Sequence, residues 1–255
     1  MKKIVLAGFI CALLIFSPAF ISVSAEEAPE DLPASETVEL EMEEELVRQQ
    51  ALGSNIRAGG GFAAGLMRAD MSGLNDVLQD EGFADLSSTI FMLGGGGTGG
   101  SRDSHRFGGF GLGGSVESRQ GNQKAVLDVG FGGFLYEHGV HVEDDFDLAL
   151  GIMLGGGEKE LSLTADHPDD FSQIVEDVAG GNHNSVTMEK SFAAVQPQAN
   201  LHYRLTNFLG LNFTAGYLLS HDLGSEWEVG GRAVADGPLS NFRGPNFRVR
   251  LSLGF

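Results

Sequence analysis

Apolar and polar residues alternate with a period of two along most of the chain after residue 55. The alternation is clearest in three segments, 145–163, 188–204 and 208–220, where an apolar side chain follows nearly every polar or small one. Successive side chains of a β-strand point to opposite faces. Each of these segments therefore predicts a strand with one apolar face and one polar face.

The same alternation, enriched in glycine in its first half, predicts eight strands in all. Their approximate bounds are 56–68, 88–99, 106–117, 124–138, 145–163, 188–204, 208–220 and 247–255. Alternate connections are short, at about 100–105, 139–144 and 205–207, and short connections allow only antiparallel pairing. Three of the other four are long; the four are 69–87, 119–123, 164–187 and 221–242. The pattern thus predicts an all-β fold, an eight-stranded antiparallel up-and-down β-barrel with short turns at one rim and long loops at the other.

The first long connection carries a helical pattern instead. Apolar residues at helical spacing, with a serine to cap the start and a glycine to end it, predict one short helix; these residues are Met71, Ser72, Leu74, Val77, Leu78 and Gly82. Three roles remain open for this helix. It is a lid over the barrel mouth, a surface for a partner, or an element that buries its own apolar stripe against the rim.

The last predicted strand resembles the terminal strand of bacterial outer-membrane β-barrels, which end in phenylalanine after alternating apolar residues. The resemblance implies an assembly signal, recognised by the barrel-assembly machinery, made of Phe247, Val249, Leu251, Leu253 and Phe255. Residues 56–255 as a whole resemble small barrels of the OmpA/OmpX architecture. This implies a place in the outer membrane of a diderm bacterium, in contact with its lipid. Only 3 tyrosines and 1 tryptophan are available for aromatic girdles, so a secreted or periplasmic soluble barrel is the alternative.

The amino-terminal segment predicts export. Lys2 and Lys3 precede a short apolar run and a small-residue cleavage site, which is typical of a secretory signal peptide over 1–25. The only cysteine, Cys11, lies within it, so the mature chain is expected to form no disulfide. Residues 26–55 follow as an acidic periplasmic leader that is expected to be partly disordered, because ten acidic residues and no basic one fall between Glu26 and Glu45.

If apolar residues face outward, the polar residues of the strands face the lumen. The lumen polar network expected on this basis is Asp128, Asp147, Gln196, Gln198, Asn200, His202, Arg204, Arg248 and Arg250. We expect the arginines of the strands predicted over 188–204 and 247–255 to pair with Asp128, Asp147 or a loop acid, because unpaired buried charges are costly. An eight-stranded interior is about filled by side chains. A structural polar core is therefore the first interpretation, and a narrow selectivity ring is the second.

Composition excludes some functions and leaves others open. With 35 acidic against 16 basic residues, the chain repels nucleic acid. The run Gly94–Gly100 lacks the Lys-Ser/Thr of a phosphate-binding loop. We predict no cofactor, and we expect the histidines and acids near His138 and His141 to form a solvated turn instead of a metal site. The 38 glycines either let the strands bend or leave a small cavity for an apolar ligand.

Together these features predict an integral outer-membrane barrel with a structural or surface-interaction role through its long extracellular loops. The first alternative is a lipid-acting barrel enzyme, for which His167, Asp169 and His183 in a long loop are the candidates. No residue is assigned a catalytic role, and the chain is more readily interpreted as a non-enzyme. The second alternative is a narrow pore or a carrier of a small apolar ligand.

Overall fold

A computed structural model describes residues 56–142, 145–165, 172, 175–176, 180, 185–224, 226–234 and 242–254. These residues belong to one compact unit, Gln49–Phe255. The predicted signal peptide and acidic leader, which together cover residues 1–55, lie outside the described residues. So do Phe255 and the loop candidates His167, Asp169 and His183.

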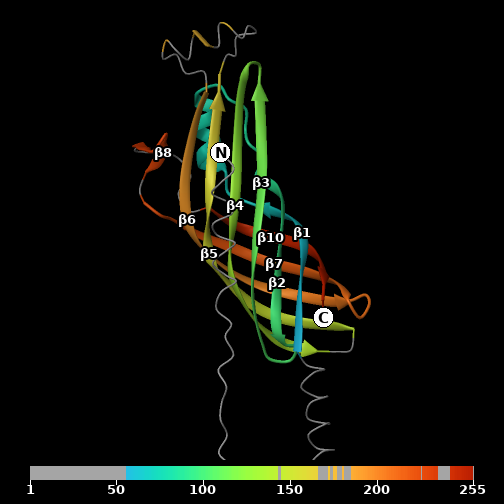
Figure 1. Ribbon diagram of the computed structural model, residues 1–255. Coiled ribbons are helices and arrows are strands. Elements are labelled where there is room, and N and C mark those ends of the chain that lie inside the picture. The colour runs from blue at the N-terminus through green and yellow to red at the C-terminus, as the bar shows by residue number, and fades with distance from the viewer. Residues whose placement is uncertain are drawn as a thin grey trace, which may run out of the picture. The chain divides into compact units, whose positions relative to one another are not determined.

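Eight long antiparallel strands close into a barrel (Figure 1). They are β1 (Ile56–Arg68), β2 (Thr89–Ser101), β3 (His105–Gln120), β4 (Gln123–Val142), β5 (Phe146–Thr164), β6 (Ser185–Arg204), β7 (Leu209–Asp222) and β10 (Arg243–Leu253). Consecutive strands pair with each other, and β10 pairs with both β7 and β1, which closes the cylinder. The predicted up-and-down barrel is confirmed.

The strands differ in length, and the difference builds two sections. Pairing of β2 with β3 ends at Met92 and Gly114, whereas pairing of β3 with β4 continues to Gln120 and Gln123. The ends of β3 to β6 therefore extend past their neighbours on the side of the long connections. We call this extension the upper section. It comprises strand residues 115–120, 123–131, 155–164 and 185–194, together with helix α3 (Ser72–Asp80) and the hairpin β8 (Trp227–Val229) and β9 (Arg232–Val234).

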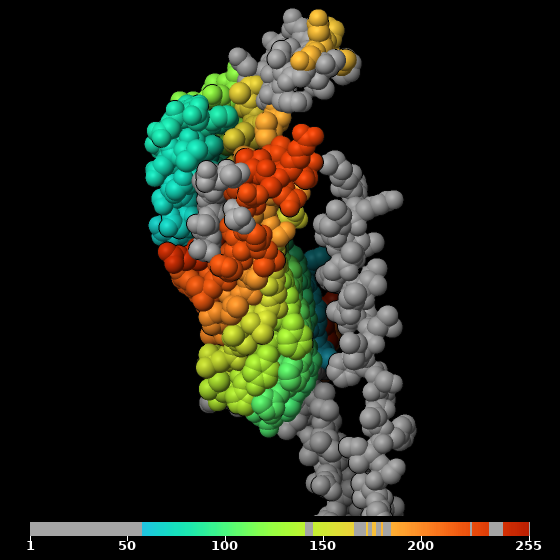
Figure 2. All heavy atoms as spheres, turned by 90° about the vertical axis from the view of Figure 1, so that its left-hand side faces the viewer, coloured from blue at the N-terminus to red at the C-terminus, as the bar shows by residue number. Residues whose placement is uncertain are grey.

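Helix α3 and the β8–β9 hairpin contribute buried apolar side chains to the upper section, where the shorter strands do not reach. Leu74 and Leu78 of α3 are buried, and so is Trp227 of β8. The segment after α3 is held by Ser118, whose hydroxyl donates to the Ala84 carbonyl at 2.7 Å. Both elements lie at the upper end of the barrel wall (Figure 2). The helix was predicted, whereas the hairpin was not, because its strands have only three residues each.

The start of α3 differs from the prediction. Ser72 is the first helical residue and does not cap the helix. Instead, Asp70 accepts hydrogen bonds from the Ser72 amide at 3.1 Å and from its hydroxyl at 2.7 Å. These bonds lower the pKa of the Asp70 carboxyl. Gly82 ends the helix as predicted, with a positive φ of 83° that suits glycine.

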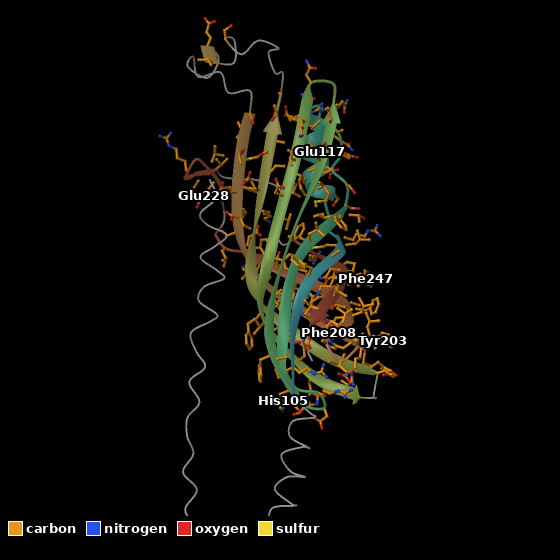
Figure 3. The ribbon with its side chains drawn as sticks, turned by 45° about the vertical axis from the view of Figure 1, so that its right-hand side comes forward. His105, Glu117, Tyr203, Phe208, Glu228 and Phe247 are labelled. Carbon is orange, nitrogen blue, oxygen red and sulfur yellow. The ribbon has the colours of Figure 1, made fainter. Side chains whose placement is uncertain are left out.

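Below the upper section, the barrel has an apolar outside and a mainly polar inside. We call this part, down to the rim of the short turns, the lower section. Its exposed apolar side chains form a continuous band that includes Phe62, Phe107, Phe134, Leu150, Leu154, Leu201, Tyr203, Phe208, Phe213, Tyr217, Phe247, Val249, Leu251 and Leu253. Figure 3 shows Tyr203, Phe208 and Phe247 along it. Such a band around a polar lumen is the surface of an outer-membrane β-barrel.

In the upper section the polarity is reversed. Most inward positions are apolar, as at Leu127, Val129 and Phe131 of β4, whereas outward positions include Glu117, Asp128 and other polar residues. Asp128 therefore does not face the lumen, and that prediction is wrong. The period of two continues through β4 from Ala125 to Glu137, but the apolar residues change from the inner face to the outer face along it. An apolar interior under a polar exterior is what a protein surface in water requires.

Inward-facing glycines make room for aromatic rings between the two sections. A Cβ at Gly96 would lie 2.5 Å from the Cβ of Phe110, and one at Gly157 would lie 2.6 Å from Cζ of Phe192. Phe110 and Phe131 meet edge to face with ring centroids 6.2 Å apart. The glycines thus allow the narrow barrel to be filled by rings, which close the lumen above the polar part.

Candidate functional site

The lumen of the lower section gathers polar side chains from six strands. They are Arg106, Glu137, Asp147, Gln196, Gln198, Asn200, His202, Asn212, Thr214, Asn246, Arg248, Arg250 and Ser252, all buried. Their alternation with outward apolar residues on the same strands forces them inward. Because removal from water is costly for each of them, their partners decide what the lumen can do.

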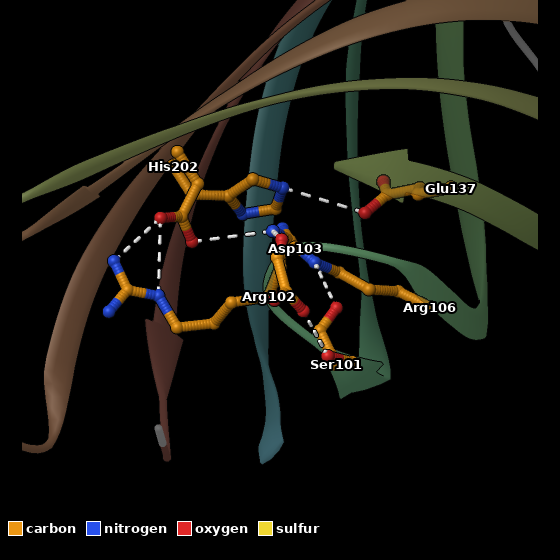
Figure 4. Close-up of polar contacts among 7 residues, drawn as sticks. Ser101, Arg102, Asp103, Arg106, Glu137 and His202 are labelled. Atoms are coloured by element: carbon orange, nitrogen blue, oxygen red, sulfur yellow. Dashed lines mark hydrogen bonds and ion pairs between the residues drawn. The ribbon is translucent and has the colours of Figure 1, made fainter. Parts of the chain in front are cut away.

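Asp147 forms a charged cluster at the short-turn rim. Its carboxylate oxygens lie 2.7 Å from an amino group of Arg102 and 3.4 Å from one of Arg106. Arg106 also donates to the carbonyl of Ser101 at 3.2 Å and to the carbonyl of Arg102. The cluster therefore fastens the β2–β3 turn to β5. Figure 4 shows Arg102, Arg106 and Ser101 at this turn.

A second cluster is centred on Glu137 of β4. Asn200 donates to Glu137 Oε1 at 2.7 Å, and His202 Nε2 lies 3.5 Å from Glu137 Oε2 (Figure 4). Thr214 extends the cluster to β7 by donating to the Asn200 side-chain oxygen at 2.5 Å. Three strands are thereby linked across the lumen.

A third cluster holds Arg248 through neutral groups. Arg248 donates to Gln198 Oε1 at 2.9 Å, Gln196 donates to the same oxygen at 2.8 Å, and Asn246 donates to Gln196 at 2.9 Å. The Arg248 guanidinium also lies 3.7 Å from the centre of the Phe110 ring. A cation over an aromatic face is attracted to it. Arg248 therefore links the polar lumen to the ring layer above.

The structure places seven of the nine expected lumen residues in the interior: Asp147, Gln196, Gln198, Asn200, His202, Arg248 and Arg250. Arg204 is half-buried at the rim, and Asp128 is outside. Asp147 pairs with Arg102 and Arg106, which come from a turn and from the start of β3 and not from the two strands expected to supply its partners. Both arginines were missed, as was Glu137, although an inward charge within the strand predicted over 124–138 was a usable signal.

A cavity of about 30 Å³ opens among these side chains near the short-turn rim. It is lined by Gly59, Thr98, Arg106, Asp147, His202, Asn212, Arg250, Ser252 and Gly254. Pockets for small organic ligands are typically about 300–1,000 Å³. The cavity therefore suits water or a single small ion, and it is too small for a typical organic ligand.

A buried ion cluster also occurs in the upper section. The ammonium group of Lys159 lies 2.8 Å from Asp222 Oδ1, and that of Lys190 lies 3.1 Å from Asp222 Oδ2. Lys159 Nζ is 5.7 Å from the centre of the Trp227 ring. Trp227 is buried here, so it anchors its own loop to β5 and β6.

An acidic row crosses the outer face of the upper section. Strand register pairs Asp128 with Glu160, Glu160 with Glu189, and Glu189 with Glu228 of β8. Like charges directly opposite one another on a sheet repel. Partial burial and the charges of Glu189 and Asp128 raise the pKa of Glu160.

Within the part of the chain that the structure describes, no three His, Cys, Asp or Glu residues are arranged to hold a metal ion. His138 instead lies against His105, with ring centroids 5.2 Å apart, and His105 Nδ1 is 2.7 Å from the Tyr136 hydroxyl. None of the described helices combines the length and apolar character needed to cross a membrane.

No family model matches the sequence, and no curated protein matches it. Solved structures with a distant likeness include Ail, the attachment invasion locus protein of Yersinia pestis, in complex with the heparin analogue sucrose octasulfate. It matches 79% of this chain and 98% of its own at 8% identity and a TM-score of 0.43. For Neisserial surface protein A, the match covers 78% of this chain and 97% of the other chain, at 10% sequence identity and a TM-score of 0.42. For the outer membrane protease OmpT of Escherichia coli, the match covers 78% of this chain and 95% of the other chain, at 9% sequence identity and a TM-score of 0.31.

Proposed function

We propose that this protein is an integral outer-membrane barrel that presents its upper section at the cell surface, in a structural or surface-interaction role. The reversal of polarity carries this proposal. The lower section offers apolar side chains to lipid, and the upper section offers Glu117, Asp128 and Glu189 to water. A body held above the membrane by its own continuing strands is suited to contact with other molecules.

Transport fits the interior poorly. The lumen of the lower section is filled by hydrogen-bonded side chains, and the rings of Phe110 and Phe131 lie above them. The described cavity of about 30 Å³ has no space for a solute larger than a small ion. In planar bilayers we expect the purified protein to give no stable conductance steps. Regular steps would instead favour the narrow-pore alternative.

Surface labelling tests the proposed orientation. A single cysteine at Glu117 (Glu117→Cys), in the upper section, should react with a membrane-impermeant maleimide on intact cells. The matched variant is Asn207→Cys in the exposed β6–β7 turn, which should react only after the outer membrane is permeabilised. The opposite labelling pattern would place the upper section in the periplasm and overturn the proposed role.

We further propose that β10 is the segment recognised during barrel assembly. Its outward residues Phe247, Val249, Leu251 and Leu253 are 43–61% exposed, and the strand forms the closing seam with β1. We expect Phe247→Asp to reduce insertion into the membrane. The control is Ser252→Ala, an inward change on the same strand. Equal insertion of both variants and the wild type would contradict this assignment.

A further inference from the structure

Positive charge exceeds negative charge in the lower lumen. Among its described buried residues, three arginines, Arg106, Arg248 and Arg250, accompany two carboxylates, Glu137 and Asp147. Asp147 is already engaged by Arg102 and Arg106. Glu137 accepts from Asn200 and faces His202. A buried surplus of charge is costly unless a counter-charge compensates it.

Arg250 makes no direct contact with a counter-charge among the described residues, and the charge of Glu137 acts on it only from beyond ion-pair distance. It is 7% exposed, and its Nε is buried without a hydrogen-bond acceptor. No hydrogen bond or ion pair joins its guanidinium to another side chain in the described part of the barrel. Arg250 lines the cavity at the short-turn rim together with Arg106, His202 and Asn212. Arg250, whose Nε has no acceptor, thus lines a cavity that already has a second arginine in its wall.

We propose that this cavity binds one small monovalent anion of the size of chloride. The charge surplus calls for an anion, and guanidinium and amide N–H groups are suitable donors to it. The volume of about 30 Å³ limits the occupant to a single ion with little accompanying water. Asp147 also lines the cavity, and its two arginine partners reduce its repulsion of the anion. The ion would complete the packing of the lumen at the end where β1 and β10 close the barrel.

The test compares chloride with gluconate, which is too large for the cavity. Full-length protein folded in detergent is unfolded with urea at constant ionic strength, and the folded fraction is read from gel mobility. Above the dissociation constant, each tenfold increase in chloride is expected to raise the folded-to-unfolded ratio about tenfold. Bromide should replace chloride. Equal stability in chloride and gluconate at all concentrations would overturn the proposal.

Two arginine variants show whether the chloride dependence of stability arises at Arg250. In Arg250→Met the chloride dependence should vanish, whereas Arg119→Met, which removes an exposed arginine of β3, should retain it. An undiminished dependence in Arg250→Met would also overturn the proposal. If Arg250→Met does not fold, the site is tested instead by anomalous diffraction from wild-type crystals that contain bromide. An anomalous peak within hydrogen-bond reach of Arg250 supports the site, and an empty cavity at saturating bromide contradicts it.

Discussion

At the scale of single residues, buried charges of the lower section depend on partners from distant parts of the chain. Asp147 and Arg102 are 45 positions apart, and Asn200 and Glu137 are 63 apart. The period of two indicated that Asp147, Asn200 and Arg250 would be inside. It could not indicate their partners, because register between strands depends on three-dimensional closure and not on local pattern.

We expect Asp147→Asn to lower the free energy of unfolding by about 3–5 kcal/mol, because it removes the carboxylate that the buried Arg106 and the partly buried Arg102 share. Urea unfolding in detergent measures this. Asp145→Asn, an exposed change two residues away, should stay within about 0.5 kcal/mol of the wild type. Equal effects of the two substitutions would mean that the Asp147 pairs contribute nothing to stability.

The glycines separate into those that the fold needs and those that it tolerates. A Cβ at Gly96 would lie 2.5 Å from Phe110 Cβ, whereas the nearest atom to a Cβ at Gly111 is the Phe131 carbonyl oxygen at 3.9 Å. We expect Gly96→Ala to destabilise by about 1–3 kcal/mol through overpacking. Gly111→Ala should be neutral or slightly stabilising. The unfolding midpoints of the two variants test this expectation. A lower midpoint for Gly111→Ala than for Gly96→Ala would contradict this account of lumen packing.

At the scale of elements, α3 works as a core element of the upper section. Leu74 and Leu78 are 1–2% exposed, whereas Val77 on the same helix is 48% exposed. Helical spacing predicted the helix and its apolar stripe. Packing against the rim was one of three predicted roles, and the sequence could not decide among them, because the packing depends on β3 to β6 extending past their neighbours. The β8–β9 hairpin was not predicted, because each of its strands has only three residues.

We expect Leu74→Ala to destabilise the protein by about 2–5 kcal/mol, as is typical when a buried leucine is truncated. Val77→Ala should change stability by less than about 0.5 kcal/mol. Limited proteolysis gives an independent measurement, with faster cleavage near residues 69–88 in Leu74→Ala only. Identical behaviour of the two variants would show that α3 merely rests on the surface.

The acidic row gives the upper section a pH dependence. Because the folded-state pKa of Glu160 is raised, the stability linked to this carboxyl is full below the unfolded value of about 4.3 and is lost as the pH rises through the folded pKa. Glu160→Gln should remove this loss, whereas Glu81→Gln, outside the row, should keep it. Thermal midpoints measured between about pH 4 and 7 test this, and parallel curves for all three proteins would contradict it.

At the scale of the whole molecule, the lower section exposes mainly apolar side chains, whereas the upper section exposes mainly polar ones. The prediction of an eight-stranded barrel required only alternation and connection lengths, and both are local properties of the sequence. Asp128 shows what alternation cannot provide. Its neighbours Leu127 and Val129 alternate with it as cleanly as Leu150 and Ile152 alternate with Gly151. Only the closed barrel shows which face of each segment is buried.

The charge distribution follows the same division. The chain carries 35 acidic and 16 basic residues, yet arginines outnumber carboxylates in the described lower lumen. Acidic side chains such as Glu117, Glu189 and Glu228 lie outside, on the upper section. Figure 3 shows Glu117 and Glu228. The negative exterior keeps the upper section solvated, and the cationic lumen is separated from it by the ring layer.

Nitroxide accessibility tests the two-section arrangement most directly. Single spin labels at Leu150, Leu251 and Asp128 of the protein in lipid vesicles are compared by collision with oxygen, which partitions into lipid, and with a water-soluble nickel complex. Leu150 and Leu251 should be reached mainly by oxygen, and Asp128 mainly by nickel. Labels at Leu150 and Leu251 that nickel reaches as readily as Asp128, or a label at Asp128 in lipid, would contradict the account.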